Sequence, residues 1–197
     1  MRRALLLAAL TLLPASAAAE KGGRFDGAFR KYSKRLFGIG FDWRVFKAQA
    51  IAESNLNPDA RSSVGAVGLM QLMPSTFGAV QTKNPELQNI DDPEWNIAAG
   101  ILYDRQLWDS WSDHDSVPDR LRFMLGAYNA GRVTLLRAQE KARAARLNEN
   151  AWSSIEIVAP KVPRWRHGET LGYVRKIDEN FARISPSATG LDGLLGW

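Results

Sequence analysis

Apolar residues recur at helical spacing along almost the whole chain, and this pattern limits the fold more than any other feature. No segment alternates at period two for long enough to form a convincing strand. Glycine, proline and asparagine interrupt the pattern, as at Asn57-Pro58 and Asp92-Pro93. The spacing predicts helices at 26–37, 42–54, 74–80, 95–111, 118–129, 131–147 and 168–184. We therefore expect a mainly α single helical domain without internal repeats.

The first nineteen residues have the composition of an export signal. Arg2 and Arg3 precede an apolar stretch, Ala4 to Leu13, which is too short to span a bilayer. The alanines at 17–19 then form a small-residue cleavage site, so we predict a signal peptide at 1–19. A membrane anchor, the alternative, needs a longer apolar run. With no cysteine available for lipid attachment, the mature protein is expected to be periplasmic or secreted, without a transmembrane anchor.

The absence of cysteine excludes a disulfide scaffold, cysteine zinc sites and a cysteine nucleophile. His114 and His167 are the only histidines, so few side chains could bind a metal ion, and we expect neither metal nor cofactor. The net charge is +5, and it falls to +3 once Arg2 and Arg3 are removed. A mildly basic exported protein suits an anionic polymer such as a bacterial cell wall. Nucleic acid would suit the charge equally well, but export argues against it.

A glutamate at the end of an apolar helix is the first candidate for chemistry. The predicted helix 42–54 is apolar nearly all round, and Glu53 lies in its last turn, just before Asn57-Pro58. Burial disfavours the charged form of a carboxyl group and raises its pKa, which makes Glu53 a candidate general acid. The alternative is a glutamate at a helix end that points to solvent. The apolar neighbours and the loop that follows favour the functional interpretation.

The loop after Glu53 is rich in small residues. Gly65 and Gly68 allow the backbone to approach a ligand closely, and Ser62 could hydrogen-bond the carboxyl group or a substrate oxygen. Gln71 both donates and accepts, which suits sugar hydroxyl and acetamido groups. A second glycine-containing motif at 127–131 lies far downstream and would have to converge on the same cleft. Together these features point to an enzyme that cleaves glycan.

Three motif blocks, in order along the chain, resemble those of the family 1 lytic transglycosylases. The resemblance extends from about residue 40 to 180. The first block comprises Glu53-Ser54, Asn57-Pro58, Ser62, Gly65-Ala66, Gly68-Leu69-Met70-Gln71 and Met73-Pro74. The second is Ala127-Tyr128-Asn129-Ala130-Gly131, the third contains Glu169-Thr170 and Tyr173-Val174, and Asn96 to Gly100 resembles the helix between the first two.

The resemblance implies a lysozyme-like helical fold and cleavage of peptidoglycan between N-acetylmuramic acid and N-acetylglucosamine. By this resemblance the catalytic domain covers 41–184, after a lead-in and first helix at 20–40 and before a tail at 185–197. Glu53 matches the single catalytic acid/base. The resemblance also suggests these substrate-binding residues: Ser62, Gln71 and Tyr128, which match positions lining the site; Met73, whose backbone would contact the sugar; Asn129, in the second block; and Glu169, a motif residue near the cleft. Glu169 could instead be a favourable charge at the start of the last helix.

A site with one carboxylate requires the substrate to supply the nucleophile. Ordinary glycosidases use two carboxylates, but the only acid between Glu53 and Glu86 is Asp59, which follows a proline in a turn. In the implied mechanism Glu53 protonates the bridging oxygen and then deprotonates the C6 hydroxyl, which closes a 1,6-anhydro ring. The alternatives are a goose-type lysozyme-like hydrolase, with Asp59 or Asp42 as second carboxylate, and a wall-binding module of a secretion apparatus. Peptidoglycan is the expected partner in each case, and no protein partner is predicted.

Overall fold

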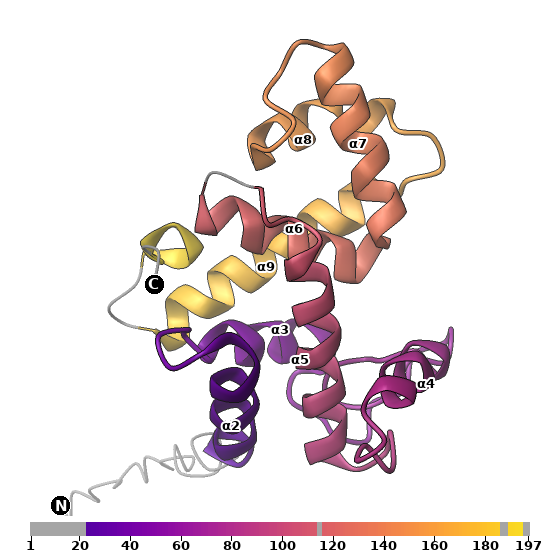
Figure 1. Cartoon of the computed structure of the whole chain (residues 1–197), viewed down its shortest axis with the longest axis vertical. Coiled ribbons are helices and arrows are strands. Elements are labelled where there is room, and N and C mark those ends of the chain that lie inside the picture. The colour runs from indigo at the N-terminus through magenta and orange to yellow at the C-terminus, as the bar shows by residue number, and fades with distance from the viewer. Residues whose placement is uncertain (1–22, 114–115, 186–188, 195–197) are drawn as a thin grey trace, which may run out of the picture.

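The computed structural model describes residues 23–113, 116–185 and 189–194, and the predicted signal peptide lies outside them. Eight α-helices and two 3₁₀ helices occupy these residues (Figure 1). The helices are α2 Asp26–Phe37, α3 Arg44–Ser54, α4 Pro74–Lys83, α5 Pro93–Asp109, α6 Val117–Ala130, α7 Arg132–Ala144, α8 Trp152–Val158, η1 Ala159–Lys161, α9 His167–Ile184 and η2 Gly190–Gly193. Within these ranges the only β-structure is two isolated bridges near residue 67, which confirms the mainly α class.

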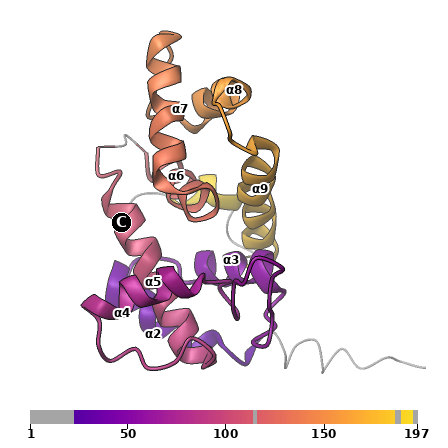
Figure 2. The ribbon, with the colours of Figure 1, turned by 90° about the vertical axis from the view of Figure 1, so that its right-hand side faces the viewer.

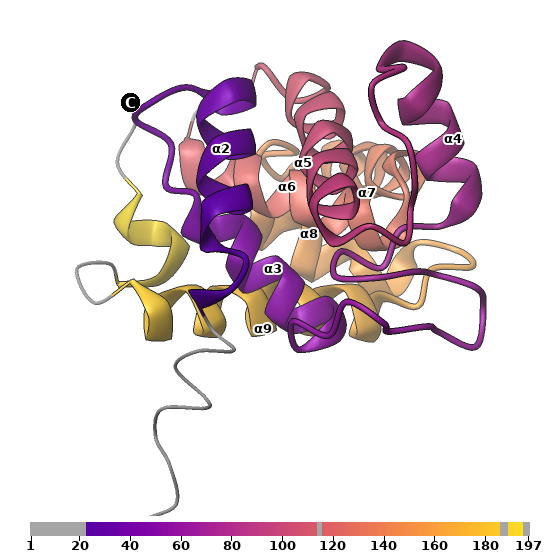
Figure 3. The same cartoon turned by 90° about the horizontal axis from the view of Figure 1, so that it is seen from below.

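Helix α3 lies at the centre of the arrangement. It packs along α9 on one side, and α2 packs against both α3 and α5 (Figures 1 and 3). Helix α6 contacts α5, α7 and α9 and so connects the two ends of the molecule. Helices α7 and α8 pack on each other at the end far from α2 and α4 (Figure 2). No helix in the described ranges is long and apolar enough to span a membrane.

Aromatic packing joins α2, α3 and α5. The rings of Phe37 and Phe41 lie 4.5 Å apart, Phe46 stacks on Phe41 at 5.2 Å, and Trp108 meets Phe37 edge-on at 5.9 Å. All four side chains are buried. Aromatic pairs in such geometries stabilise by about 0.5–1.5 kcal/mol beyond the burial of their area. The N-terminal part of α3 is therefore held firmly, and the helix can present its last turn in a fixed place.

In two helices, prolines that the sequence pattern marked as breaks stand inside the first turn, so these helices begin earlier than predicted. Helix α5 begins at Pro93 and not at 95, since the Asp92 side chain accepts hydrogen bonds from the backbone amides of Glu94 and Trp95. Helix α6 begins just before Pro118, after a Ser116 cap. Proline suits the first turn because the amide it lacks has no partner within the helix.

Helix α8 was missed by the sequence analysis, because its stabilising contacts come from distant residues. It has only seven residues, too few for a clear period, and the residue before it, Ala151, provides no side-chain cap. The cap comes instead from Asp119 on α6, whose Oδ1 accepts from the Trp152 amide at 2.9 Å. The Trp152 ring meets Phe123 edge-on at 5.6 Å. Tertiary contacts thus supply what the local sequence lacks.

The Asp119→Ala variant tests this account of α8. The Asp119 carboxylate caps the Trp152 amide and also accepts from the Ser116 hydroxyl at 2.7 Å. We expect the free energy of unfolding in urea to fall by about 1–2 kcal/mol, and the Trp152 amide to exchange faster with solvent. Asp119→Asn keeps an acceptor oxygen, so its free energy of unfolding should fall by less than that of Asp119→Ala. An unchanged exchange rate at Trp152 would contradict the proposed cap.

Candidate active site

The end of α3 turns the chain back on itself. Asn55 and Leu56 have φ angles of 53° and 57°, in the left-handed region that asparagine tolerates well. The Ser54 hydroxyl donates to the Leu69 carbonyl at 2.9 Å, so the returning loop lies against the last turn of α3. That turn carries Glu53, as the sequence analysis expected. The chain reversal therefore brings the glycine-containing loop beside the candidate carboxyl group.

Asn96 on α5 holds the returning loop in place. Its Oδ1 accepts from the Met70 amide at 2.8 Å, and its Nδ2 donates to the carbonyls of Val67 and Ile90, both at 3.0 Å. Gly68 packs directly on this amide with φ of 76°, and a Cβ there would lie 2.5 Å from the Asn96 Nδ2. Glycine at 68 is thus required both by conformation and by space.

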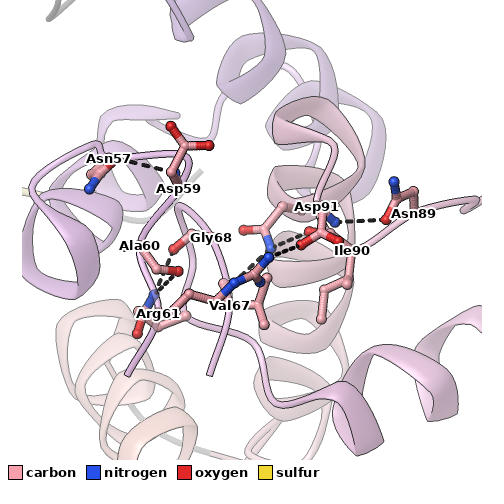
Figure 4. Close-up of polar contacts among 11 residues, drawn as sticks. Asn57, Asp59, Ala60, Arg61, Val67, Gly68, Asn89, Ile90 and Asp91 are labelled. Atoms are coloured by element: carbon pink, nitrogen blue, oxygen red, sulfur yellow. Dashed lines mark hydrogen bonds and ion pairs between the residues drawn. The ribbon is translucent and has the colours of Figure 1, made fainter. Parts of the chain in front are cut away.

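The base of the loop is closed by contacts drawn in Figure 4. The Gly68 amide donates to the Ala60 carbonyl at 2.8 Å, and Arg61 forms an ion pair with Asp91 at 2.6 Å. Both partners of this ion pair are about half exposed, so it contributes little to stability by itself. The backbone and amide contacts therefore determine the shape of the loop.

Glu53 is partly buried, and its surroundings shift its titration. Burial raises the pKa of the Glu53 carboxyl to about 7, against the opposing effects of Tyr173 and Lys176. The Tyr173 hydroxyl donates to the Glu53 Oε1 at 2.6 Å, which favours the charged carboxylate. Lys176 donates to the Ala52 carbonyl at 2.8 Å, at the C-terminal end of α3. A carboxyl group that titrates near 7 can donate a proton and later accept one at neutral pH.

Tyr128 lies near this carboxyl group, and Tyr103 packs against Tyr128. The Tyr128 hydroxyl donates to the Met70 carbonyl at 2.7 Å, and its ring lies 5.3 Å from that of Tyr103. Burial holds the pKa of Tyr128 well above its ordinary value, and the charge of Glu53 adds to this effect. Tyr128 is therefore a neutral hydroxyl that fixes the loop backbone and forms part of the surroundings of Glu53.

The structure places the three loop residues that the sequence singled out as follows. The Ser62 hydroxyl accepts from the Ala66 amide at 2.9 Å, so it stabilises the loop itself. The Gln71 amide nitrogen donates to the carbonyls of Gly68 and Ala60, at 2.9 and 3.3 Å. Met73 is 38% exposed and precedes α4. The expected contacts of these residues with substrate stay predictions.

Asn129 at the end of α6 and Glu169 at the start of α9 lie close together. Both line a pocket of about 200 Å³ between the end of α6 and the start of α9. The Asn129 Oδ1 accepts from the Thr170 hydroxyl at 2.8 Å. Glu169 is exposed in the first turn of α9 and forms an ion pair with Arg166 at 3.1 Å, so the position fits both interpretations offered for it. Their substrate-binding roles also stay predictions.

The sequence analysis did not select Tyr173, Asn96 or Asp104 as site residues. Tyr173 and Asn96 stood within the quoted motifs, but hydrogen-bond partners across the fold cannot be read from one sequence. Asp104 had a readable signal, because it continues the buried helical spacing of Ile97 and Ile101 on α5. An ionisable residue on such a face indicates a special environment. The described residues include no group of three or more His, Cys, Asp or Glu side chains suited to a metal ion.

Comparison with known proteins gives consistent matches. Residues 33–151 match the family described as the transglycosylase SLT domain. The chain is 34% identical over 135 residues to a membrane-bound lytic murein transglycosylase F of Maricaulis maris, a match that covers 68% of this chain and 28% of that protein. A protein of the same name from Stutzerimonas stutzeri is 33% identical over 154 residues, covering 77% of this chain and 30% of the relative. The chain thus spans less than a third of these relatives' length.

A solved structure shares the fold. The crystal structure of the 70 kDa soluble lytic transglycosylase of Escherichia coli matches with a TM-score of 0.60 and 27% sequence identity. The match covers 80% of this chain and 23% of that one. It confirms the predicted lysozyme-like helical fold. The same enzyme in complex with bulgecin A gives the same TM-score at 23% identity.

Asn96→Ala tests the role of the amide that fixes the loop. The change leaves the Met70 amide and the Ile90 carbonyl without this partner, whereas the Val67 carbonyl still accepts from the Leu72 amide. Each buried group that loses its partner costs about 1–3 kcal/mol, so we expect the free energy of unfolding to fall by about 3 kcal/mol. Asn96→Asp keeps the acceptor for Met70 but places a buried carboxylate oxygen against the two carbonyl oxygens, so it should lose at least as much stability as Asn96→Ala. A loss below about 1 kcal/mol for Asn96→Ala would contradict the assignment.

Tyr173→Phe tests the electrostatics of Glu53. The tyrosine hydroxyl stabilises the charged carboxylate, so its removal should raise the pKa of Glu53 further above about 7. The measurement is a carbon NMR titration of the glutamate side-chain carboxyl groups, with the Glu53 signal assigned by its absence in Glu53→Gln. Tyr103→Phe serves as the control, because it removes the hydroxyl of a ring that packs on Tyr128. A lower pKa in Tyr173→Phe would contradict the stated effect of the hydrogen bond.

Proposed function

Because the chain belongs to the transglycosylase SLT domain family, we propose that it is a peptidoglycan lytic transglycosylase. It cleaves the β-1,4 bond between N-acetylmuramic acid and N-acetylglucosamine and leaves a 1,6-anhydromuramoyl end. The observation that carries this proposal is the Glu53 carboxyl, with a pKa of about 7 and a hydrogen bond from Tyr173. Such a group is suited to serve first as an acid and then as a base.

In the first step, neutral Glu53 protonates the bridging oxygen. Tyr173 occupies the Glu53 Oε1, so the transferable proton resides on Oε2. The acetamido group of the muramic acid residue assists the departure at C1. As the proton leaves, the hydrogen bond from Tyr173 and the nearby charge of Lys176 stabilise the carboxylate that forms, since both lower the pKa of Glu53. Burial of the carboxyl acts in the opposite direction, because it raises the pKa of Glu53 and so favours the neutral form.

In the second step, ionised Glu53 takes the proton of the C6 hydroxyl. The C6 oxygen then attacks C1 and closes the anhydro ring, so no water is consumed. The carboxyl returns to its neutral state and is ready for another cycle. Substrate positioning is assigned to Ser62, Gln71, Met73, Tyr128, Asn129 and Glu169. Of these, Asn129 and Glu169 line one pocket and are the members best placed to contact a ligand together.

Neither Asp42 nor Asp59, the second carboxylates named for the hydrolase alternative, lies where that role requires. Asp42 precedes α3 and pairs with Arg44 at 3.1 Å, at the opposite end of the helix from Glu53. This separation is roughly 15 Å along the axis, too far to reach the same sugar. Asp59 is exposed, on the solvent side of its turn. The wall-binding alternative would not need a carboxyl that titrates near neutrality.

The enzyme is proposed to act in the periplasm or after secretion, once residues 1–19 are removed near Ala19. Two of the relatives described above carry the name membrane-bound lytic murein transglycosylase F, and peptidoglycan is the polymer that murein denotes. This supports a wall substrate outside the cytoplasm.

Glu53→Gln tests the proposed function. We expect release of soluble muropeptides from purified peptidoglycan to fall at least about 100-fold, because the amide can neither donate nor accept the proton. Circular dichroism and the unfolding midpoint should stay close to wild type. Asp59→Asn is the matched control and should retain full activity.

Mass spectrometry of the products separates the alternatives. Wild-type products lighter by one water than their reducing counterparts are the expected result. Reducing ends would assign the protein to the hydrolases instead. Equal release of muropeptides by wild type and Glu53→Gln would show that Glu53 does not take part in the reaction.

A further inference from the structure

A second acidic residue lies buried near Glu53 and has no role in the mechanism above. Asp104 on α5 has no exposed surface, and its Oδ1 accepts from the Gln49 Nε2 on α3 at 3.3 Å. Gln49 is equally buried and lies one turn before Glu53, so the two side chains share a face of α3. The Asp104–Gln49 contact therefore joins α3 to α5 directly behind the candidate catalytic carboxyl.

Two atoms of this pair lack a partner among the described residues: the Asp104 Oδ2 and the Gln49 Oε1. Both are acceptors when the acid is ionised, and a buried acceptor without a donor needs an explanation. A proton on the Asp104 Oδ2 turns that oxygen into a donor, and the Gln49 Oε1, on the amide that already donates to the Asp104 Oδ1, is an acceptor without a donor. One proton shared between these two atoms would satisfy both. It also removes the large cost of burying an unpaired charge.

We propose that Asp104 is a neutral carboxylic acid, joined to the Gln49 amide by two hydrogen bonds, and that this pair is a positioning element for Glu53. The pair fixes the turn of α3 that precedes Glu53 and keeps negative charge away from it. The structural part stands by itself, whereas the effect on turnover rests on the proposed function. Burial, with the charge of Glu53, raises the pKa of Asp104 well above its ordinary value, which agrees with a neutral acid.

The ionisable groups around Asp104 come from four helices. They are Glu53 on α3, Tyr103 on α5, Tyr128 on α6 and Tyr173 on α9, and the tyrosines are all held neutral by burial. Lys176 on α9 is the cation that acts on Glu53. When Glu53 ionises, its negative charge makes Asp104 hold its proton more tightly. Asp104 therefore stays neutral throughout the cycle, and Glu53 alone titrates near neutral pH.

Asp104→Asn tests the protonation state, because the amide of asparagine reproduces both hydrogen bonds of a neutral acid. Between about pH 4 and the raised pKa of Asp104, the folded wild type binds one proton more than the unfolded chain, so its stability falls as pH rises. Asp104→Asn lacks this linkage. The wild-type unfolding equilibrium constant should therefore rise about tenfold per pH unit relative to Asp104→Asn. Parallel profiles from pH 4 to 8, or a variant that does not fold, would overturn the proposal.

Infrared spectroscopy gives a second, independent readout. In Glu53→Gln at pH 8, where exposed carboxyl groups are ionised, the carbonyl stretch of one protonated acid should remain. It should disappear in the Glu53→Gln/Asp104→Asn double variant. Absence of the band in Glu53→Gln would show that Asp104 is ionised and would overturn the proposal.

The pH profile of muropeptide release tests the positioning role. Asp104→Asn should keep the wild-type profile, because neither protein has a charge at residue 104. An acid shift of the profile would mean that a negative charge had been removed, and would overturn the proposal. Asp104→Ala removes both hydrogen bonds and leaves the Gln49 amide unpaired, so turnover should fall while Asp104→Asn stays active. The unfolding and infrared measurements need no substrate, so their result is independent of whether the wild type cleaves peptidoglycan.

Discussion

The Glu53 carboxyl lies where the C-terminal end of α3 meets α9, and the arrangement of the other helices serves this junction. Burial and the negative end of a helix dipole both disfavour a charged carboxylate at this place. The Tyr173 hydroxyl and the Lys176 ammonium, both from α9, act in the opposite direction. The balance of these effects leaves a pKa of about 7. A small displacement of α9 relative to α3 would alter every contribution to this balance.

Two different structures keep the junction rigid. On the inner side, the aromatic rings of α2, α3 and α5 fix the beginning of α3, and the Asp104–Gln49 pair fixes its second turn. On the outer side, the Asn96 side chain forms three hydrogen bonds to backbone groups. Two of them hold the returning loop, at Met70 and Val67, and the third is to Ile90. Residues of α5 take part on both sides, so this helix links the shape of the loop to the position of the carboxyl group. The chemistry of the site therefore depends on a helix that contributes no reacting atom.

Much of the fold was readable from the sequence, because its signals are local. Amphipathic spacing located seven of the eight described α-helices, and the apolar run before Glu53 indicated that its carboxyl would be shielded from water. Helix α8 was missed because Asp119, from another helix, caps it. Tyr173 and Lys176 could not be assigned because their partners lie 120 and 124 residues away along the chain. Local pattern predicts helices and burial, whereas hydrogen bonds between distant helices require the structure.

In the proposed mechanism a single carboxyl group carries both proton transfers, and the substrate itself supplies the nucleophile. Digestion of purified peptidoglycan in heavy-oxygen water shows where the oxygen at C1 comes from. Newly formed muramoyl ends should carry no heavy oxygen at C1, because the C6 hydroxyl closes the ring. One heavy oxygen at C1 for every bond cleaved would contradict the mechanism, since that oxygen can only come from attacking water.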